Sequence, residues 1–337
     1  MIDVLLFFIA AAILLYVLFG GADYGAGITE LLPIPNPFRD KQKHVINEAM
    51  GPVWESNHIW LILLVVILFV GFPPIFLTIM TSLHFPMLAL LFGIVLRGCA
   101  FTFRHYDAIN DEKSQRIYTL TFGLSSLWTS IWLGILLASL NRGLIDPESD
   151  HFYTAYIAPW IGIYPLTMGL FVAFIFAFLA SIYLIGETDD VSLKKIFVRR
   201  AYAFNILIVI FGGLVFLSSY LEQGSLATQF FSHPLAVTAM LAATLCFVLL
   251  WFVIKKRKAI WVRIVAAAQM SLIIAGWFLT YAPHALLTKQ GAINFYEAAA
   301  PRSTQVQLVI ALVVGSLFIF PALIFLLKVF QSKQMRL

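Results

Sequence analysis

The sequence predicts an all-α, polytopic membrane protein with nine transmembrane helices, and three observations support this fold class. Of the 337 residues, 61% are hydrophobic and 12% are charged, whereas a soluble domain carries about 25% charged residues. Nine segments are apolar over the roughly 20 residues that a helix needs to cross a bilayer. The segments between them are all short, so the sequence offers no room for a separate soluble domain.

The predicted spans follow one another along the whole chain. They cover residues 4–31, 57–77, 79–103, 116–140, 158–185, 201–221, 234–254, 260–282 and 306–328. The first span contains the polar stretch GGADYGAG, and a tight turn at Phe72-Pro73-Pro74 is expected to join the second span to the third. Prolines at positions 33, 35 and 37 are expected to keep the loop after the first span extended.

The spans are expected to form two four-helix bundles and one C-terminal helix within a single integral membrane domain. Residues 1–142 form the first predicted bundle, residues 143–283 the second, and residues 284–337 hold the ninth helix. The stretch 186–205 carries three acidic residues followed by four basic ones, which predicts a solvated, self-neutralising loop between the fifth and sixth spans. Any repeat between the two halves would be parallel, because each half has four spans.

The basic residues predict an N-terminus outside and a C-terminus in the cytoplasm. In this orientation 18 of the 22 Lys and Arg residues are cytoplasmic, the excess that inner loops of membrane proteins carry. These are Arg39, Lys41, Lys43, Arg104, Lys113, Arg116, Lys194, Lys195, Arg199, Arg200, Lys255, Lys256, Arg257, Lys258, Arg263, Lys328, Lys333 and Arg336. Arg142, Lys289 and Arg302 fall outside, and Arg97 falls within a span. The net charge of +5 therefore reflects topology and does not indicate nucleic-acid binding.

The cysteines exclude several kinds of site. Cys99 and Cys246 lie in different apolar segments, and the sequence has no CxxC, CxxCH or zinc-type Cys/His spacing. Disulfides, covalently attached haem and structural zinc are therefore not expected. We also expect no cleavable signal peptide, because Asp3 precedes the first apolar run and no basic segment comes before it.

Polar residues in the first three spans are predicted to meet at one depth near the cytoplasmic face. Asp23 lies toward the inner end of the first span, Glu55, Asn57 and His58 at the start of the second, and Arg97 in the inner third of the third. A charge within a span costs at least about 2.5–3.5 kcal/mol unless it is paired or hydrated. Arg97 therefore needs a carboxylate, and both Asp23 and Glu55 are available. Two hypotheses remain open: a structural salt bridge, or a polar inlet for cytoplasmic protons.

The histidines argue against a haem held by two axial histidines of this chain. His58 is predicted at the inner side of the membrane and His84 at the outer side, so the two could not ligate one iron. The remaining histidines fall in loops or at span ends. A haem with a single His or Glu ligand from this chain remains an open alternative.

Four motifs together resemble subunit II of the cytochrome bd-type terminal quinol oxidases. They are GADYGAG, GPVWESNHIWLI, FPPIF and LRGCAFTFRH, which occur in the order and spacing of that family. The resemblance is dense over residues 15–106, and the number and polarity of the spans fit across the whole chain.

The resemblance implies a bacterial cytoplasmic-membrane complex that oxidises quinol and reduces dioxygen to water. It implies that haem b and haem d are held by a partner, subunit I, and that this chain ligates none, with a structural quinone or lipid as a further occupant. A small single-helix accessory subunit, membrane lipids and quinol are the other expected partners. The implied roles are stabilisation of subunit I and the lining of a cytoplasmic proton path. The path candidates are Asp23, Trp54, Glu55, Asn57, His58 and Arg97.

One departure from the family pattern affects that path. Glu55 stands where many relatives have Asp, and Ser56 follows it where they have Gly. The carboxylate is kept, but it reaches one methylene further. Two other functions are compatible with the residues alone. A secondary transporter would show broken helices near the bilayer midplane, and a structural scaffold would use the charged residues only to hold helices together.

Overall fold

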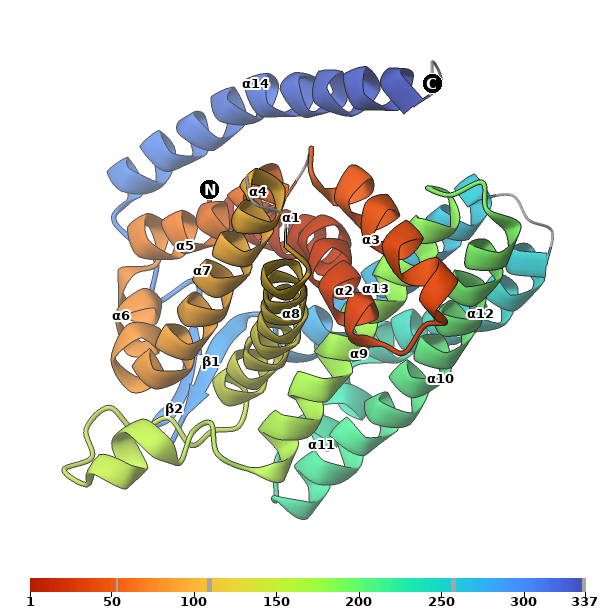
Figure 1. The fold of residues 1–337 in the computed structure, drawn as a ribbon. Coiled ribbons are helices and arrows are strands. Elements are labelled where there is room, and N and C mark those ends of the chain that lie inside the picture. The colour runs from red at the N-terminus through yellow and green to blue at the C-terminus, as the bar shows by residue number, and fades with distance from the viewer. Residues whose placement is uncertain (53, 108–110, 256–258, 335–337) are drawn as a thin grey trace.

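A computed structural model describes residues 1–52, 54–107, 111–255 and 259–334 and confirms a mostly helical membrane protein (Figure 1). Within these residues, nine helical segments are long and apolar enough to span a membrane. They are Ile2–Leu31, Trp54–Gly71, His84–Arg104, Glu112–Leu140, Ile163–Ile185, Val191–Leu221, Pro234–Lys255, Ala259–Tyr281 and Arg302–Ala322. The number and order of the predicted spans are confirmed, while several of their ends differ.

The first four spans are built from six helices and one π-helical turn. Helix α1 (Ile2–Leu15), the π-helix η1 (Tyr16–Gly20) and α2 (Gly21–Leu31) form the first span. The second consists of α4 (Trp54–Asn57) and α5 (Ile59–Gly71), the third is α7 (His84–Tyr106) and the fourth is α8 (Glu112–Leu140). Because η1 directly precedes α2, the wider π-helical turn ends just before Asp23.

Two connections in this half differ from the prediction. The tight turn expected at Phe72-Pro73-Pro74 is wrong: Phe72 leaves the helical conformation, and the prolines begin a further helix, α6 (Pro73–Ser82). The loop expected to be extended contains α3 (Asn36–Met50), with Pro37 in its first turn. The physical reason is the same in both cases. Proline restricts the residue before it but is well suited to the first turn of a helix.

The second half contains α9 (Ile163–Ile185), α10 (Val191–Leu221), α12 (Pro234–Lys255) and α13 (Ala259–Tyr281). A π-helix η2 (Tyr153–Ile157) precedes α9, and a short α11 (Leu226–Ser232) follows α10. The loop predicted at 186–205 is wrong beyond residue 190. The side chain of Asp190 caps the backbone N–H groups of Ser192 and Leu193, so that α10 begins there and carries Arg200 into the interior.

Helix α9 forms the centre of the protein. In its most apolar window 72% of the residues are buried, against 50% or less in every other span of the described chain. It packs against α2 and α8 on one side and against α10 and α13 on the other. A Cβ atom added at Gly25 of α2 would overlap the backbone carbonyl of Phe176, so the absence of a side chain there allows α2 to approach α9 closely.

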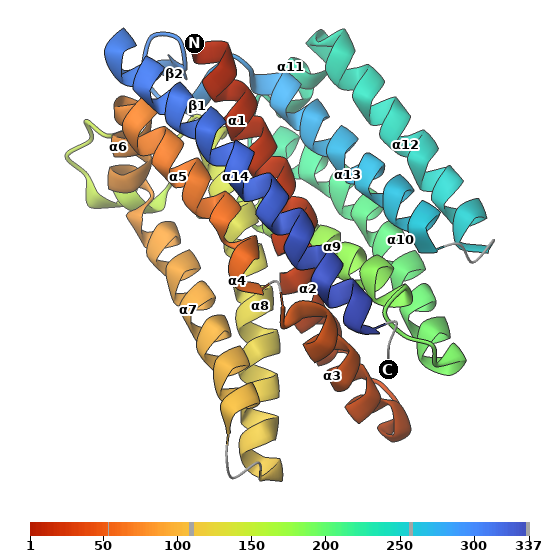
Figure 2. The ribbon, with the colours of Figure 1, turned by 90° about the horizontal axis from the view of Figure 1, so that it is seen from above.

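The two ends of the protein carry different elements (Figure 2). One end holds the N-terminus, α6, α11 and a hairpin of β1 (His284–Thr288) and β2 (Gly291–Asn294). The other end holds α3, the start of α8 and the end of α14. We call it the basic end, because α3 carries Arg39, Lys41 and Lys43 and the first turns of α8 carry Lys113 and Arg116. The last helix, α14 (Arg302–Gln334), lies across α1 and α5. Lys256, Arg257, Lys258 and Arg336 lie outside the described residues, and nothing is described of the Lys328 and Lys333 side chains.

Candidate functional site

A fully buried ion pair lies at the centre of the predicted polar site. The guanidinium Nη2 of Arg97, on α7, donates a hydrogen bond to Oδ1 of Asp23, on α2, and both side chains are 0% exposed. The Arg97 guanidinium also lies over two aromatic rings, 5.0 Å from the ring centroid of Tyr24 and 5.2 Å from that of Phe122. Of the two carboxylates that the sequence offered to Arg97, the structure therefore pairs it with Asp23.

The polar residues at the start of the second span surround this pair unevenly. Asn57 is buried and interacts with the Asp23 carboxylate. His58 is partly buried, and its ring meets the Tyr24 ring edge-on at 5.9 Å between centroids. Trp54 packs on Phe101 at 5.5 Å and does not join the ion pair. The side chain of Glu55 is exposed.

The difference in exposure between Glu55 and Asn57 follows from the geometry of the short helix α4. Residues two apart on a helix do not share a face, so when Asn57 points into the bundle, Glu55 points out of it. The sequence predicted that these residues lie near Asp23, and in the structure Asn57 interacts with the Asp23 carboxylate. It could not tell which of them faced inward, because the same segment is apolar on all sides from residue 59 onward.

Several polar atoms of the site have no hydrogen-bond partner among the described residues. They are Oδ2 of Asp23, Nε and Nη1 of Arg97, and Nδ1 of His58. Buried polar atoms in proteins are nearly always bonded to protein groups or to ordered water. The site therefore offers a set of donors and an acceptor that can bind water or a further polar group.

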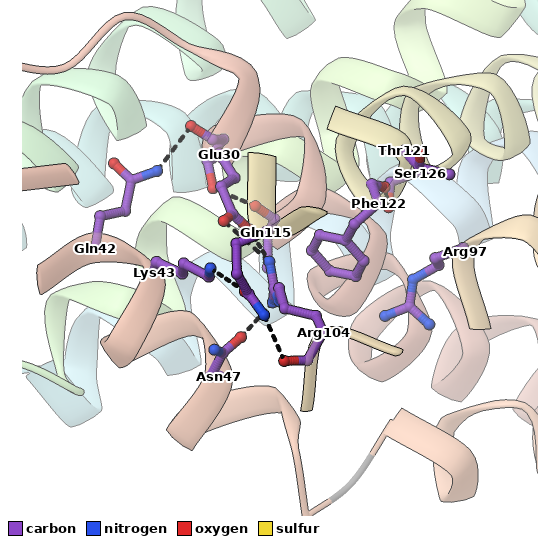
Figure 3. Close-up of polar contacts among 12 residues, drawn as sticks. Glu30, Gln42, Lys43, Asn47, Arg97, Arg104, Gln115, Thr121, Phe122 and Ser126 are labelled. Carbon is purple, nitrogen blue, oxygen red and sulfur yellow. Dashed lines mark hydrogen bonds and ion pairs between the residues drawn. The ribbon is translucent and has the colours of Figure 1, made fainter. Parts of the chain in front are cut away.

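A second buried ion pair, which the sequence analysis missed, lies closer to the basic end (Figure 3). Nη1 of Arg104 donates to both carboxylate oxygens of Glu30, at 3.0 and 2.9 Å, and the two side chains are 1% and 5% exposed. Nη2 of Arg104 donates to Oδ1 of Asn47, on α3. Arg104 was assigned to a cytoplasmic loop, which is wrong, because α7 continues to Tyr106. The available signal was spacing: Glu30 follows Asp23, and Arg104 follows Arg97, by seven residues.

Helix α3 covers this second pair and is held by polar contacts to both halves of the protein. Lys43 donates to Gln115 of α8 at 2.6 Å, and Gln42 donates to the carbonyl of Thr29 at 3.2 Å. From the second half, Arg200 donates to Oε1 of Gln42 at 2.9 Å. Burial, followed by the positive charge of Arg104, lowers the pKa of Lys43. The cluster at the basic end is therefore continuous from Arg200 through α3 to Arg104.

Comparison with known proteins identifies the family. A sequence profile described as "Cytochrome bd terminal oxidase subunit II" matches residues 1–330. The chain belongs to this family. Membership confirms the resemblance seen in the motifs and means that the chain is subunit II of a bd-type oxidoreductase complex with a subunit I partner and haem groups.

Two relatives of this bd oxidase subunit II illustrate how far the similarity extends. It is 23% identical over 291 residues to cytochrome bd ubiquinol oxidase subunit 2 of Bacillus subtilis (strain 168), which covers 84% of this chain and 81% of that protein. Its fold matches a chain of the bd oxidase structure from Geobacillus thermodenitrificans with a TM-score of 0.78 and 17% identity. That match covers 97% of this chain and 98% of the other.

His58 and His84, the two histidines that the sequence places within the spans, have different neighbours in the described structure. His58, between α4 and α5, lies beside Tyr24, whereas His84, the first residue of α7, contacts Tyr156. Among the described residues, no three or more His, Cys, Asp or Glu side chains are grouped so that they could hold a metal ion.

Proposed function

We propose that this chain is the non-haem-ligating subunit of the quinol oxidase, that it stabilises the haem-bearing subunit I, and that it lines a cytoplasmic proton path. Reduction of dioxygen to water consumes protons, which must reach the haem site through the protein. The observation that carries the proposal is the fully buried Asp23–Arg97 pair, with unpartnered polar atoms around it. Chains of carboxylate and histidine groups are the usual means of proton transfer in membrane proteins.

The two carboxylates have different roles in this path. Asp23 is fixed by Arg97 and Asn57, so its charge holds the guanidinium in place and orients polar groups around it. Glu55 has an exposed side chain that Arg97 does not hold, and it is free to accept a proton and pass it on. Trp54 and His58 flank this route. In the assembled complex, the exposed face that carries Glu55 would meet subunit I.

Uptake of cytoplasmic protons requires one orientation of the protein in the membrane. The basic end faces the cytoplasm of a bacterium, the N-terminus faces outward, and the protein spans the cytoplasmic membrane. The predicted bundles at 1–142 and 143–283 and the ninth helix at 284–337 act as one unit, because α9 packs against helices of both halves. Exposed apolar side chains such as Leu88, Phe92 and Val95 on α7 are available for contact with subunit I or with lipid.

A Glu55→Gln variant of the assembled oxidase tests the path. We expect quinol oxidase turnover per haem d to fall about tenfold or more, the scale on which a lost proton-transfer group acts, while haem content stays unchanged. Glu48→Gln is the matched control, because Glu48 is another exposed carboxylate at the basic end and contacts only His44 at 3.3 Å among the described ion pairs. Unchanged turnover in Glu55→Gln would refute the path.

A purely structural scaffold is the second candidate function, and the complete burial of the Asp23–Arg97 pair favours it. Under this alternative, Glu55→Gln has no effect on turnover. Asp23→Asn then lowers only the amount of assembled, haem-containing complex, and the complex that does assemble turns over at the wild-type rate.

A further inference from the structure

The two buried ion pairs repeat on the same pair of helices. Asp23 and Glu30 are both on α2, and Arg97 and Arg104 are both on α7, seven residues apart in each case. Seven residues make two helical turns, about 10.5 Å along the axis. The ring of Phe122, on α8, lies between the two guanidinium groups, 5.2 Å from that of Arg97 and 4.7 Å from that of Arg104 (Figure 3).

We propose that Glu30 is the proton-uptake residue at the cytoplasmic end of the path, and that Arg104 is the residue that positions it. This inference rests on the proposed function, because it adds a first step to the same path. In it, Glu30 accepts a proton from the cytoplasmic side, and the proton then passes toward the Asp23–Arg97 site two turns further into the membrane.

The hydrogen bonds of Arg104 explain why this pair can take up a proton. Arg104 donates to Glu30 through Nη1 and to Asn47 through Nη2. When Glu30 is protonated, the guanidinium keeps Asn47 as a partner and still lies over Phe122. Arg97 has no such second acceptor among the described residues, so protonation of Asp23 would leave a buried charge unpaired, which is far more costly. The pair nearer the cytoplasm is therefore the one whose carboxylate can change its charge.

Glu30 has charged neighbours on its cytoplasmic side, while Asp23 lies on its other side. On the cytoplasmic side it is faced by Arg104 of α7 and by Lys43 of α3. Asp40 of α3 faces Lys43, and Arg200 of α10 donates to the neighbouring carbonyl of Thr29. The lowered pKa of Lys43 makes that amine a proton donor more readily than an ordinary lysine.

Between Glu30 and Asp23, the chain presents a small residue and a hydroxyl group. Gly27 lies so close to Ser126 of α8 that a Cβ atom there would overlap the serine Oγ. Ser126 donates to the carbonyl of Phe122 at 2.7 Å, which leaves its oxygen able to accept a hydrogen bond. The face of α2 between the two carboxylates therefore borders a polar atom, where a bulkier apolar side chain would have interrupted the route.

The test compares Glu30→Gln with Glu30→Asp and Asp23→Asn in the assembled oxidase. We expect Glu30→Gln to lower turnover per haem d about tenfold at mildly alkaline pH and by much less at mildly acidic pH, because the supply of protons limits the rate only when protons are scarce. Glu30→Asp should recover much of the rate. Glu187→Gln is the control, since Glu187 also forms an ion pair with an arginine, 2.6 Å from Arg263, but with its side chain 21% exposed. It should behave like the wild type.

Each outcome decides between the inference and the function on which it rests. If Asp23→Asn slows turnover per haem and Glu30→Gln does not at any pH, the path stands and Glu30 is a structural residue. If neither variant slows turnover per haem, both proposals fail. If Glu30→Gln does not assemble, the neutral pair Glu30→Gln with Arg104→Gln removes the unpaired charge. Wild-type turnover in that double variant overturns the inference, and slowed turnover restored by acidic pH supports it.

Discussion

Removal of the Asp23 carboxylate is expected to destabilise the assembled oxidase by about 3–5 kcal/mol, the usual cost of leaving one member of a buried ion pair unpaired. Both side chains are 0% exposed, so water cannot solvate the remaining charge. The other contacts of Arg97 are the rings of Tyr24 and Phe122 at 5.0 and 5.2 Å. Such cation–π contacts contribute about 2 kcal/mol when desolvated, which is too little to replace the carboxylate.

A double-mutant cycle in denaturant titrations of the purified complex measures this effect. Asp23→Asn and Arg97→Met should each be strongly destabilising, while the double variant should be less destabilised than the sum by about 2–3 kcal/mol, because it contains no unpaired buried charge. Glu48→Gln removes an exposed pair, with side chains 72% and 55% exposed, and should change stability by less than about 0.5 kcal/mol. Additive effects of the two buried substitutions would refute the reasoning.

Three further predictions follow from other parts of the structure. Gly25→Ala should sharply reduce the yield of complex, because the added Cβ would overlap the carbonyl of Phe176. Gly213→Ala is the control and should be tolerated, because no atom lies within 4 Å of the added Cβ. Equal yields of the two variants would contradict this prediction. The hydrogen bond from Lys41 is the main cause of the lowered pKa of Asp190. The Asp190 carboxylate therefore stabilises the fold at pH values above its ordinary pKa, and this stabilisation is lost as the pH falls through the lowered pKa of the folded state. Asp190→Asn should therefore flatten the acid limb of a plot of melting temperature against pH, and an unchanged limb would count against the pair. Finally, a reduced-minus-oxidised spectrum should show b- and d-type haem bands in the complex and none in the isolated chain, and bands in the isolated chain would refute haem ligation by the partner alone.

The pattern of apolar residues determined the architecture. A bilayer requires long apolar helices with internally satisfied backbone groups, so composition and span length alone predicted the class of protein and the order of its spans. The motifs around GADYGAG and GPVWESNHIW identified the family. Polar residues within the spans marked the site, because an unpaired charge in lipid is costly on any face of the helix.

Helix boundaries in the connections were less predictable. Prolines near residues 35 and 73 indicated an interruption, but the same residue type both ends one helix and begins the next. The sequence therefore could not distinguish an extended loop from α3, or a tight turn from α6. Tertiary contacts favour the helix in the case of α3, whose residues Val45, Ile46 and Met50 are buried against the bundle.

The partners of the charged residues were decided by tertiary structure alone. The sequence offered Arg97 two carboxylates at similar depth, and only the rotation of α4 turned Glu55 outward and left Asp23 as the partner. The Glu30–Arg104 pair depends on the crossing of α2 and α7 and on α3 folding over both. Sequence spacing fixes which side chains share a face of one helix, whereas the meeting of faces from different helices depends on packing contacts that no single segment contains.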